Sequence, residues 1–164
     1  MPPCSGYGCT AWDDVSLGQV VGIVICYDSS RICSLRFIYL KDSVYKMAIH
    51  GEIRESCQTI MLEYPSEYLI AVNGHRDSSS VVKSISFVTN KSTYGPFGNQ
   101  TLGYSDCKFG FLQGGKQKHW IRGFYGTLQS SGYLGSLGVF IQIQTASQPE
   151  SSRPATVKSE GQQK

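Results

Sequence analysis

The chain has 164 residues, including 18 Gly, ten Tyr and seven Phe; 16% of its residues are charged and its formal net charge is +3. This length suits one domain with a sizeable core, and the Gly and aromatic content is typical of an all-β protein with many turns. The basic cluster at residues 116–119 gives no basic face with interleaved aromatic side chains, so we expect no nucleic-acid binding. The longest apolar run, residues 20–26, is too short to cross a membrane, so we expect no membrane partner.

One seven-residue pattern occurs three times along the chain, at residues 32–38, 82–88 and 134–140. Each copy reads apolar-x-Ser-apolar-x-apolar-apolar, and the offsets between copies are 50 and 52 residues. A repeat of this length is typical of one supersecondary unit used several times, each unit being too small to bury its own apolar face. Three units around one axis predict a closed domain in which Ser34, Ser84 and Ser136 occupy equivalent positions.

Each copy of the pattern follows another apolar or aromatic run, at residues 20–25, 68–74 and 120–126. Short stretches rich in Ser, Asp or Gly separate the two runs of each pair, at residues 28–30, 76–80 and 127–132. Turn-forming residues between β-branched and aromatic runs predict a hairpin, so each unit is built on one hairpin. Further strand-like runs lie at residues 44–49 and 59–64.

The composition changes near residue 145, beyond which Val157 is the only large apolar side chain. Such a segment cannot bury enough surface to offset the entropy of ordering it. We therefore divide the chain into one folded domain, residues 1–144, and a flexible C-terminal tail or linker, residues 145–164. Deleting the residues beyond 146 is expected to leave the midpoint of thermal unfolding unchanged within error.

The six cysteines lie at positions 4, 9, 26, 33, 57 and 107. The N-terminal residues contain no basic start followed by an apolar stretch, so we see no secretory signal and expect a cytoplasmic or nuclear location. In such a compartment we expect reduced thiols that act as small buried apolar side chains. Cys26 and Cys33 flank the first hairpin turn, where paired strands would bring them opposite each other.

Motifs of enzymes and metal sites are scarce. The chain contains no Cys-x-x-Cys pair, no His-Glu-x-x-His motif and no phosphate-binding Gly-x4-Gly-Lys-Ser loop. Asp13 and Asp14 are neighbours, and neighbours on a strand point to opposite faces. The three histidines, His50, His75 and His119, are widely spaced, and we expect each at the surface or in a turn. The sequence predicts a binding module and not an enzyme, with no cofactor and no metal.

Several segments resemble the jacalin-related lectin family. Residues 8–14, Gly-Cys-Thr-Ala-Trp-Asp-Asp, are similar to its N-terminal Gly-Gly-x-x-Trp-Asp-Asp stretch, and residues 67–74 resemble its Glu-Tyr-Ile-x-x-Val-x-Gly strand. Residues 86–98 nearly match its Phe-x-Thr-Asn-x-x-x-Tyr-Gly-Pro-aromatic-Gly signature, and residues 123–126 and 133–139 resemble its last hairpin. The resemblance implies a β-prism of three four-stranded sheets with pseudo-threefold symmetry, in agreement with the repeat.

The resemblance also implies one sugar site at an end of the prism. In the family this site combines an N-terminal Gly, which lets the backbone approach the sugar, with a Gly-x-x-x-Asp loop, whose carboxylate accepts hydrogen bonds from sugar hydroxyls. This chain departs from that pattern at all three positions. The N-terminal Gly falls on Cys9, the Gly of the loop on Ser131 and its Asp on Gly135.

The remaining candidates for binding are the backbone of Gly132, Tyr133 and Leu134 and a neighbouring loop near His75. The ring of Tyr133 is either a stacking surface for sugar or a packing residue. Leu134 occupies a repeated core position, so we expect its side chain to be structural. Losing two hydrogen bonds to a carboxylate would cost about 3–6 kcal/mol, which is about two to four decades of affinity.

Two functions of different classes stay open. The first is a carbohydrate-binding lectin of the mannose/glucose type, or one for a complex oligosaccharide, with a non-standard site and a role in plant stress or defence. The second is a pseudo-lectin, a protein–protein interaction or regulatory module that binds no monosaccharide. The missing Asp favours the second, and the nearly intact scaffold is neutral between them. The expected partner is therefore a glycan or a protein, and a homodimer is left open.

Overall fold

The computed structural model describes residues 9–53, 56–112 and 119–143, which form eleven strands and no helix. No helix in this part of the chain is therefore long and apolar enough to span a membrane. The strands are β1 (Thr10–Asp13), β2 (Gln19–Tyr27), β3 (Ile32–Lys41), β4 (Val44–Gly51), β5 (Cys57–Met61), β6 (Leu69–Arg76), β7 (Val82–Thr89), β8 (Thr93–Gly98), β9 (Cys107–Leu112), β10 (His119–Leu128) and β11 (Leu134–Ile143).

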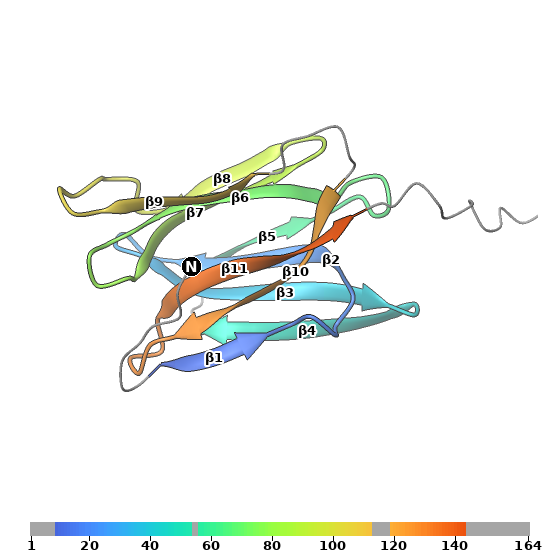
Figure 1. The fold of residues 1–164 in the computed structure, drawn as a ribbon, viewed down its shortest axis with the longest axis horizontal. Coiled ribbons are helices and arrows are strands. Elements are labelled where there is room, and N and C mark those ends of the chain that lie inside the picture. The colour runs from blue at the N-terminus through green and yellow to red at the C-terminus, as the bar shows by residue number, and fades with distance from the viewer. Residues whose placement is uncertain (1–8, 54–55, 113–118, 144–164) are drawn as a thin grey trace, which may run out of the picture.

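The strands form three antiparallel sheets around a shared interior (Figure 1). Two sheets have four strands, in the orders β4-β3-β2-β5 and β8-β7-β6-β9. The third, β1-β10-β11, has three strands among the described residues, where the sequence predicted four. The predicted all-β prism and its three central hairpins, β2–β3, β6–β7 and β10–β11, are confirmed. The predicted C-terminal tail, residues 145–164, lies outside the described residues.

The three hairpins share one register. Ser34 pairs with Cys26, Ser84 with His75 and Ser136 with Thr127, so the three serines occupy equivalent positions. In each hairpin the next residue toward the loop has no partner and forms a bulge, and these bulged residues are Cys33, Lys83 and Gly135. A bulge bends its strand and changes the direction of nearby side chains. The repeat thus encodes the bulge as well as the hairpin.

The apolar positions of the repeat form the core between the sheets. Ile32, Val82 and Leu134 are all buried, and Phe37 stacks on Phe124 with their ring centroids 4.1 Å apart. The strands alternate between this core face and an outer face, as expected for antiparallel sheets packed on one side. The hairpin loops join the strands at the ends of the prism, outside the centre of this core.

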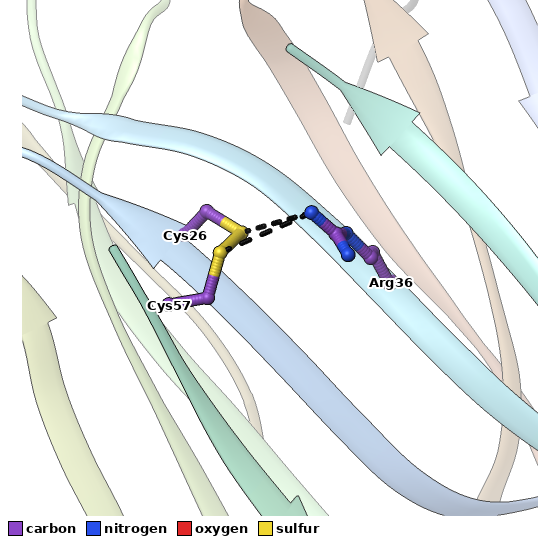
Figure 2. Close-up of a disulfide and its surroundings, with 3 residues drawn as sticks. All are labelled: Cys26, Arg36 and Cys57. Carbon is purple, nitrogen blue, oxygen red and sulfur yellow. Dashed lines mark hydrogen bonds between the residues drawn. A yellow bond between two sulfur atoms is a disulfide. The ribbon is translucent and has the colours of Figure 1, made fainter. Parts of the chain in front are cut away.

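The prediction that all cysteines are reduced thiols is wrong for one pair. Cys26 on β2 lies opposite Cys57 on β5, and the two form a disulfide bond, with the guanidinium of Arg36 beside both sulfur atoms (Figure 2). Cys26 does not face Cys33, because the bulge takes Cys33 out of register. The partner of Cys26 is far away in sequence and comes from a strand that adds to the opposite edge of β2.

The expectation that His50 lies at the surface is also wrong. His50 exposes 7% of its area, and its Nε2 lies 2.9 Å from Oδ2 of Asp14, which itself exposes only 4%. The ring of Trp12 stacks on His50 at 3.5 Å, and the hydroxyl of Tyr39 donates to Asp14 over 2.8 Å. Burial and the neighbouring Asp14 carboxylate both raise the pKa of Tyr39, so it stays a neutral donor. The Trp-Asp-Asp segment therefore joins β1 to β3 and β4.

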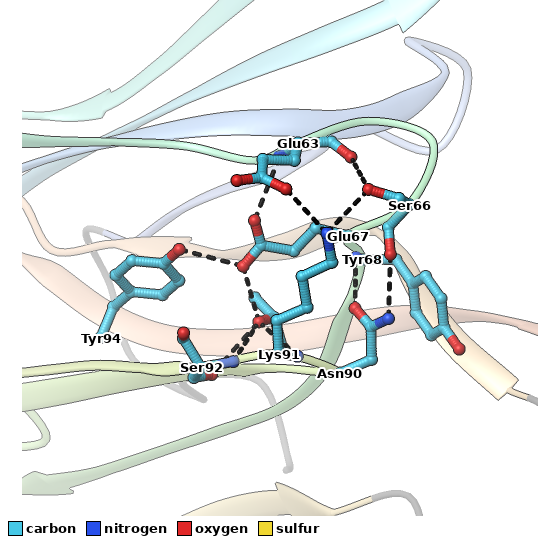
Figure 3. Close-up of polar contacts among 9 residues, drawn as sticks. Glu63, Ser66, Glu67, Tyr68, Asn90, Lys91, Ser92 and Tyr94 are labelled. Atoms are coloured by element: carbon cyan, nitrogen blue, oxygen red, sulfur yellow. Dashed lines mark hydrogen bonds and ion pairs between the residues drawn. The ribbon is translucent and has the colours of Figure 1, made fainter.

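A second buried carboxylate explains the segment that most resembles the family signature. Glu67 exposes 3% of its area and accepts hydrogen bonds from the hydroxyls of Thr89 (2.8 Å) and Tyr94 (2.9 Å) and from the backbone N–H of Glu63 (3.1 Å) (Figure 3). The side chain of Asn90 accepts from the N–H of Tyr68 and donates to the carbonyl of Ser66, in the segment that precedes β6. We call these residues the Glu67 clasp. It closes the β6–β7 hairpin at the end opposite its loop and is structural.

Candidate functional site

Three hairpin loops come together at one end of the prism, toward the left of Figure 1. They are the β2–β3 loop (residues 28–31), the β6–β7 loop (residues 77–81) and the β10–β11 loop (residues 129–133). Two contacts connect them. The side-chain amide of Gln129 donates to the carbonyl of Ser79 over 2.8 Å, and the guanidinium of Arg31 lies 4.0 Å from the centre of the Tyr133 ring. We call this surface the hairpin end.

The N-terminal strand brings a fourth segment to the hairpin end. Thr10 pairs with Leu128, the last residue of β10, so the half-buried Cys9 lies beside the start of the β10–β11 loop. The sequence prediction that Cys9 and residues 131–135 belong to one surface is thus consistent with the strand register. The segments come from the two termini of the chain, and the pairing of β1 with β10 brings them together.

The β10–β11 loop has the same backbone conformation as the β6–β7 loop. In the first, the N–H of Gln129 donates to the carbonyl of Tyr133 and the N–H of Gly132 donates to the carbonyl of Gln129. The β6–β7 loop has the same two bonds at the equivalent residues, from 77 to 81 and from 80 to 77. The left-handed residue of each loop is also equivalent, with φ of 67° at Ser80 and 82° at Gly132.

The predicted contact residues fall into two groups. Gly132 lies at the open surface, because a Cβ added there would have no atom within 4 Å. Leu134 is fully buried in the core, so only its backbone is available to a ligand. Gly135 is the buried bulge residue, and a Cβ there would meet Gln129 Cγ and Thr127 Oγ1 at 3.2 Å. A side chain at position 135 would therefore displace Gln129.

The structure places Tyr133 and His75 in different surroundings. Tyr133 is half-buried, and Arg31 covers one face of its ring in a cation–π contact. The Nδ1 of His75 lies 2.9 Å from the hydroxyl of Ser84, on the outer face of the second sheet. There His75 lines a concavity of about 410 Å³ together with Lys108, and none of the residues lining it belongs to the three hairpin loops.

Two carboxylates lie in the hairpin loops, and each caps its own loop. Oδ1 of Asp28 accepts from the hydroxyl and N–H of Ser30, both at 2.7 Å, and from the N–H of Arg31 at 3.0 Å. These bonds, the one from the Ser30 hydroxyl first, lower the pKa of Asp28 to about 2. Oδ1 of Asp77 likewise accepts from the Ser79 hydroxyl at 2.7 Å and from the Val81 N–H at 3.0 Å.

A further concavity, of about 520 Å³, lies on the outer face of the three-stranded sheet. Its lining is mostly apolar and includes Val15, Tyr125 and Phe140. Within the described residues, no group of three or more His, Cys, Asp or Glu side chains lies close enough to hold a metal ion. Of the predicted site residues, 131–135 lie at the hairpin end and Cys9 lies beside it, whereas His75 lies on the outer face of the second sheet.

Comparison with known proteins gives consistent matches along the chain. Residues 1–140 match the family described as "Jacalin-like lectin domain". The chain is 34% identical over 160 residues to Jacalin-related lectin 5 of Arabidopsis thaliana, covering 95% of this chain and 21% of that protein. It is 32% identical over 141 residues to Protein RESTRICTED TEV MOVEMENT 1 of Arabidopsis thaliana, covering 82% of this chain and 78% of that protein. The chain thus spans about a fifth of the first relative and most of the second.

Solved structures with similar folds include sugar complexes. Artocarpin with mannopentose matches with a TM-score of 0.67 and 26% identity, over 84% of this chain and 92% of that one. The galactose-binding lectin from Champedak, with Gal(beta)1,3-GalNac, matches with a TM-score of 0.66 and 25% identity, over 80% of this chain and 98% of that one.

Proposed function

This chain belongs to the jacalin-like lectin domain family, and we propose that its hairpin end binds carbohydrate. The observation that carries this proposal is the open space at Gly132 in the β10–β11 loop, where an added Cβ would meet no atom within 4 Å, beside the half-buried Tyr133. Two structures of similar fold, the artocarpin and Champedak lectin complexes, contain mannose- and galactose-type sugars respectively, which supports the ligand class and leaves the sugar undecided. A mannose/glucose-type or complex oligosaccharide fits an extended surface made by several loops.

The buried Gly135 limits how tightly a single hexose is held. It offers no carboxylate, and a Cβ at this position would already lie 3.2 Å from Gln129 Cγ and from Thr127 Oγ1. We expect mannose and glucose to bind about two to four decades more weakly than mannose binds to artocarpin, and galactose to bind more weakly by a similar factor than it binds to the Champedak lectin, each measured in parallel. Titration calorimetry decides this point. Gly135→Asp is expected to restore little affinity, because the new side chain displaces Gln129.

A glycan array with matched variants tests the proposed location. Tyr133→Ala removes the half-buried ring at the hairpin end, and the signal for any bound oligosaccharide is expected to fall roughly tenfold, the upper end for an aromatic contact. Tyr125→Ala is the control, since Tyr125 is exposed on the outer face of the three-stranded sheet. If Tyr125→Ala lost the signal and Tyr133→Ala kept it, the binding surface would be that sheet face.

The pseudo-lectin function stays as a second candidate because of Gly135. A module that binds a protein and no monosaccharide needs no carboxylate in the bulge, and the name of one relative, Protein RESTRICTED TEV MOVEMENT 1, mentions no sugar. A folded chain with no signal on a broad glycan array would favour this candidate. A role in plant stress or defence, in the cytoplasm or nucleus, belongs to either proposal, and the similarity to Arabidopsis thaliana proteins supports its plant setting.

A further inference from the structure

The three hairpin loops have related sequences but differ at one position. The β2–β3 loop begins Asp28-Ser-Ser, the β6–β7 loop begins Asp77-Ser-Ser, and the β10–β11 loop begins Gln129-Ser-Ser. The first two loops use the Asp carboxylate to accept their own N–H and hydroxyl donors. In the third loop the side chain of Gln129 points across to the carbonyl of Ser79. This loop therefore lacks the acceptor that caps the other two.

The missing cap leaves particular donors open. In the β6–β7 loop, Oδ1 of Asp77 accepts from the N–H of Val81 and the hydroxyl of Ser79. The equivalent groups in the β10–β11 loop are the N–H of Tyr133 and the hydroxyl of Ser131, because the two loops have the same backbone hydrogen bonds. Within the described residues neither group has an acceptor. Both groups are therefore donors that a ligand at the hairpin end can use.

One positive charge, on Arg31, lies beside these donors, and residues 129–133 of the loop carry no carboxylate. The guanidinium of Arg31 lies over the ring of Tyr133, and the bulge behind the loop holds Gly135. The nearby carboxylates of Asp28 and Asp77 accept bonds from their own loops. A neutral sugar presents hydroxyls that need acceptors as well as donors, whereas a carboxylate is an acceptor only and forms stronger, charge-assisted bonds.

We infer that the hairpin end selects glycans that bear a carboxylate, such as uronic acids, over their neutral counterparts. The sugar carboxylate would take the place at the Tyr133 N–H and Ser131 hydroxyl that the Asp77 carboxylate takes in the neighbouring loop, with Arg31 as the nearby cation. This inference rests on the proposed carbohydrate function and specifies its ligand class.

The test compares oligomers of galacturonic and glucuronic acid with their methyl esters, which keep the sugar rings and remove the charge. Titration calorimetry is expected to give the acids a roughly tenfold to hundredfold higher affinity than the esters. Because the surface is exposed, raising the salt concentration is expected to weaken binding of the acids and leave the esters unaffected.

Three variants test the location. Gln129→Asp supplies the missing cap and is expected to abolish binding of the acids while the protein stays folded. Ser130→Asp adds the same charge at the neighbouring exposed position without the capping geometry, and Gln129→Ala removes the bond to Ser79 without adding an acceptor. Both controls are expected to keep binding within a few fold, with any loss in Ser130→Asp well below that in Gln129→Asp.

Each outcome separates the two proposals. Esters or neutral glycans that bind as tightly as the acids would overturn the carboxylate inference and leave the carbohydrate function standing. Unchanged binding of the acids by Gln129→Asp would overturn the assignment to the β10–β11 loop. A folded chain that binds neither the acids, the esters nor any glycan of the array would overturn both.

Discussion

Replacement of Glu67 by Gln is expected to lower the free energy of unfolding by roughly 1.5–3 kcal/mol, the value of a hydrogen bond to a charged group. The groups around residue 67 all donate to its carboxylate, so the amide of the Glu67→Gln variant would match them poorly. The hydroxyl of Thr89 already accepts from the N–H groups of Lys91 and Ser92, so it acts as a donor, over 2.8 Å to Glu67 or over 3.2 Å to the carbonyl of Ser92. The NH₂ group of Gln would face such donors. Denaturant unfolding of Glu67→Gln measures the loss.

Glu63→Gln is the matched control. Glu63 is exposed, and its ion pair with Lys91 (2.7 Å) lies at the surface, where such pairs contribute about 0–1 kcal/mol. An equal loss in the two variants would contradict the special role of the buried carboxylate.

The same network predicts a pH dependence. Burial raises the pKa of Glu67, but the backbone bond from Glu63, the hydroxyls of Thr89 and Tyr94 and the charge of Lys91 outweigh it, so the pKa lies below its ordinary value of 4.5. A carboxyl with a lowered folded-state pKa stabilises the fold fully above pH 4.5, and this contribution is lost as the pH falls through the folded-state value. The stability curves of the natural chain and Glu67→Gln are therefore expected to converge in acid. Parallel curves would contradict this.

Loss of the Cys26–Cys57 disulfide is expected to lower the free energy of unfolding by about 2–4 kcal/mol. The bond closes a loop with a sequence separation of 31 residues and joins β2 to the edge strand β5, so its absence enlarges the unfolded ensemble and releases that edge. Thermal unfolding with and without reductant measures the effect.

The double variant Cys26→Ser/Cys57→Ser provides the control. It is expected to unfold at the temperature of the reduced chain and to show no further shift with reductant. Exposed Cys107 outside the pair gives a second control, since Cys107→Ser is expected to leave the transition unchanged. If the unfolding temperature of the natural chain did not change with reductant, the disulfide would not contribute to stability as expected.

Much of the candidate site was accessible from the repeat. Aligning the three loops by Ser34, Ser84 and Ser136 places Asp28, Asp77 and Gln129 at the start of each loop, and this comparison alone would have singled out Gln129. The same alignment places the bulge residues together, including Gly135. Arg31 had no such signal, because its role depends on Tyr133 of a different hairpin.

The sequence by itself determined the hairpins, their shared register and the core positions, because these depend on local turn chemistry and on the period-2 alternation of apolar residues. It missed the short strands β1, β8 and β9: β1 has only four residues, and the Gly residues of β8 and β9 and the Pro of β8 weaken their strand pattern. Such strands form because a longer neighbour offers its unpaired edge.

Only the tertiary structure decided which side chains meet between units. The partner of Cys26, the burial of His50 against Asp14 and the meeting of Arg31 with Tyr133 all depend on which strands and loops become lateral neighbours. These neighbours are distant along the chain, and no spacing or periodicity within one unit encodes their contact. The physical reason is that each hairpin buries its apolar face only against the other two, so contacts between units exist only once all three have closed around the core.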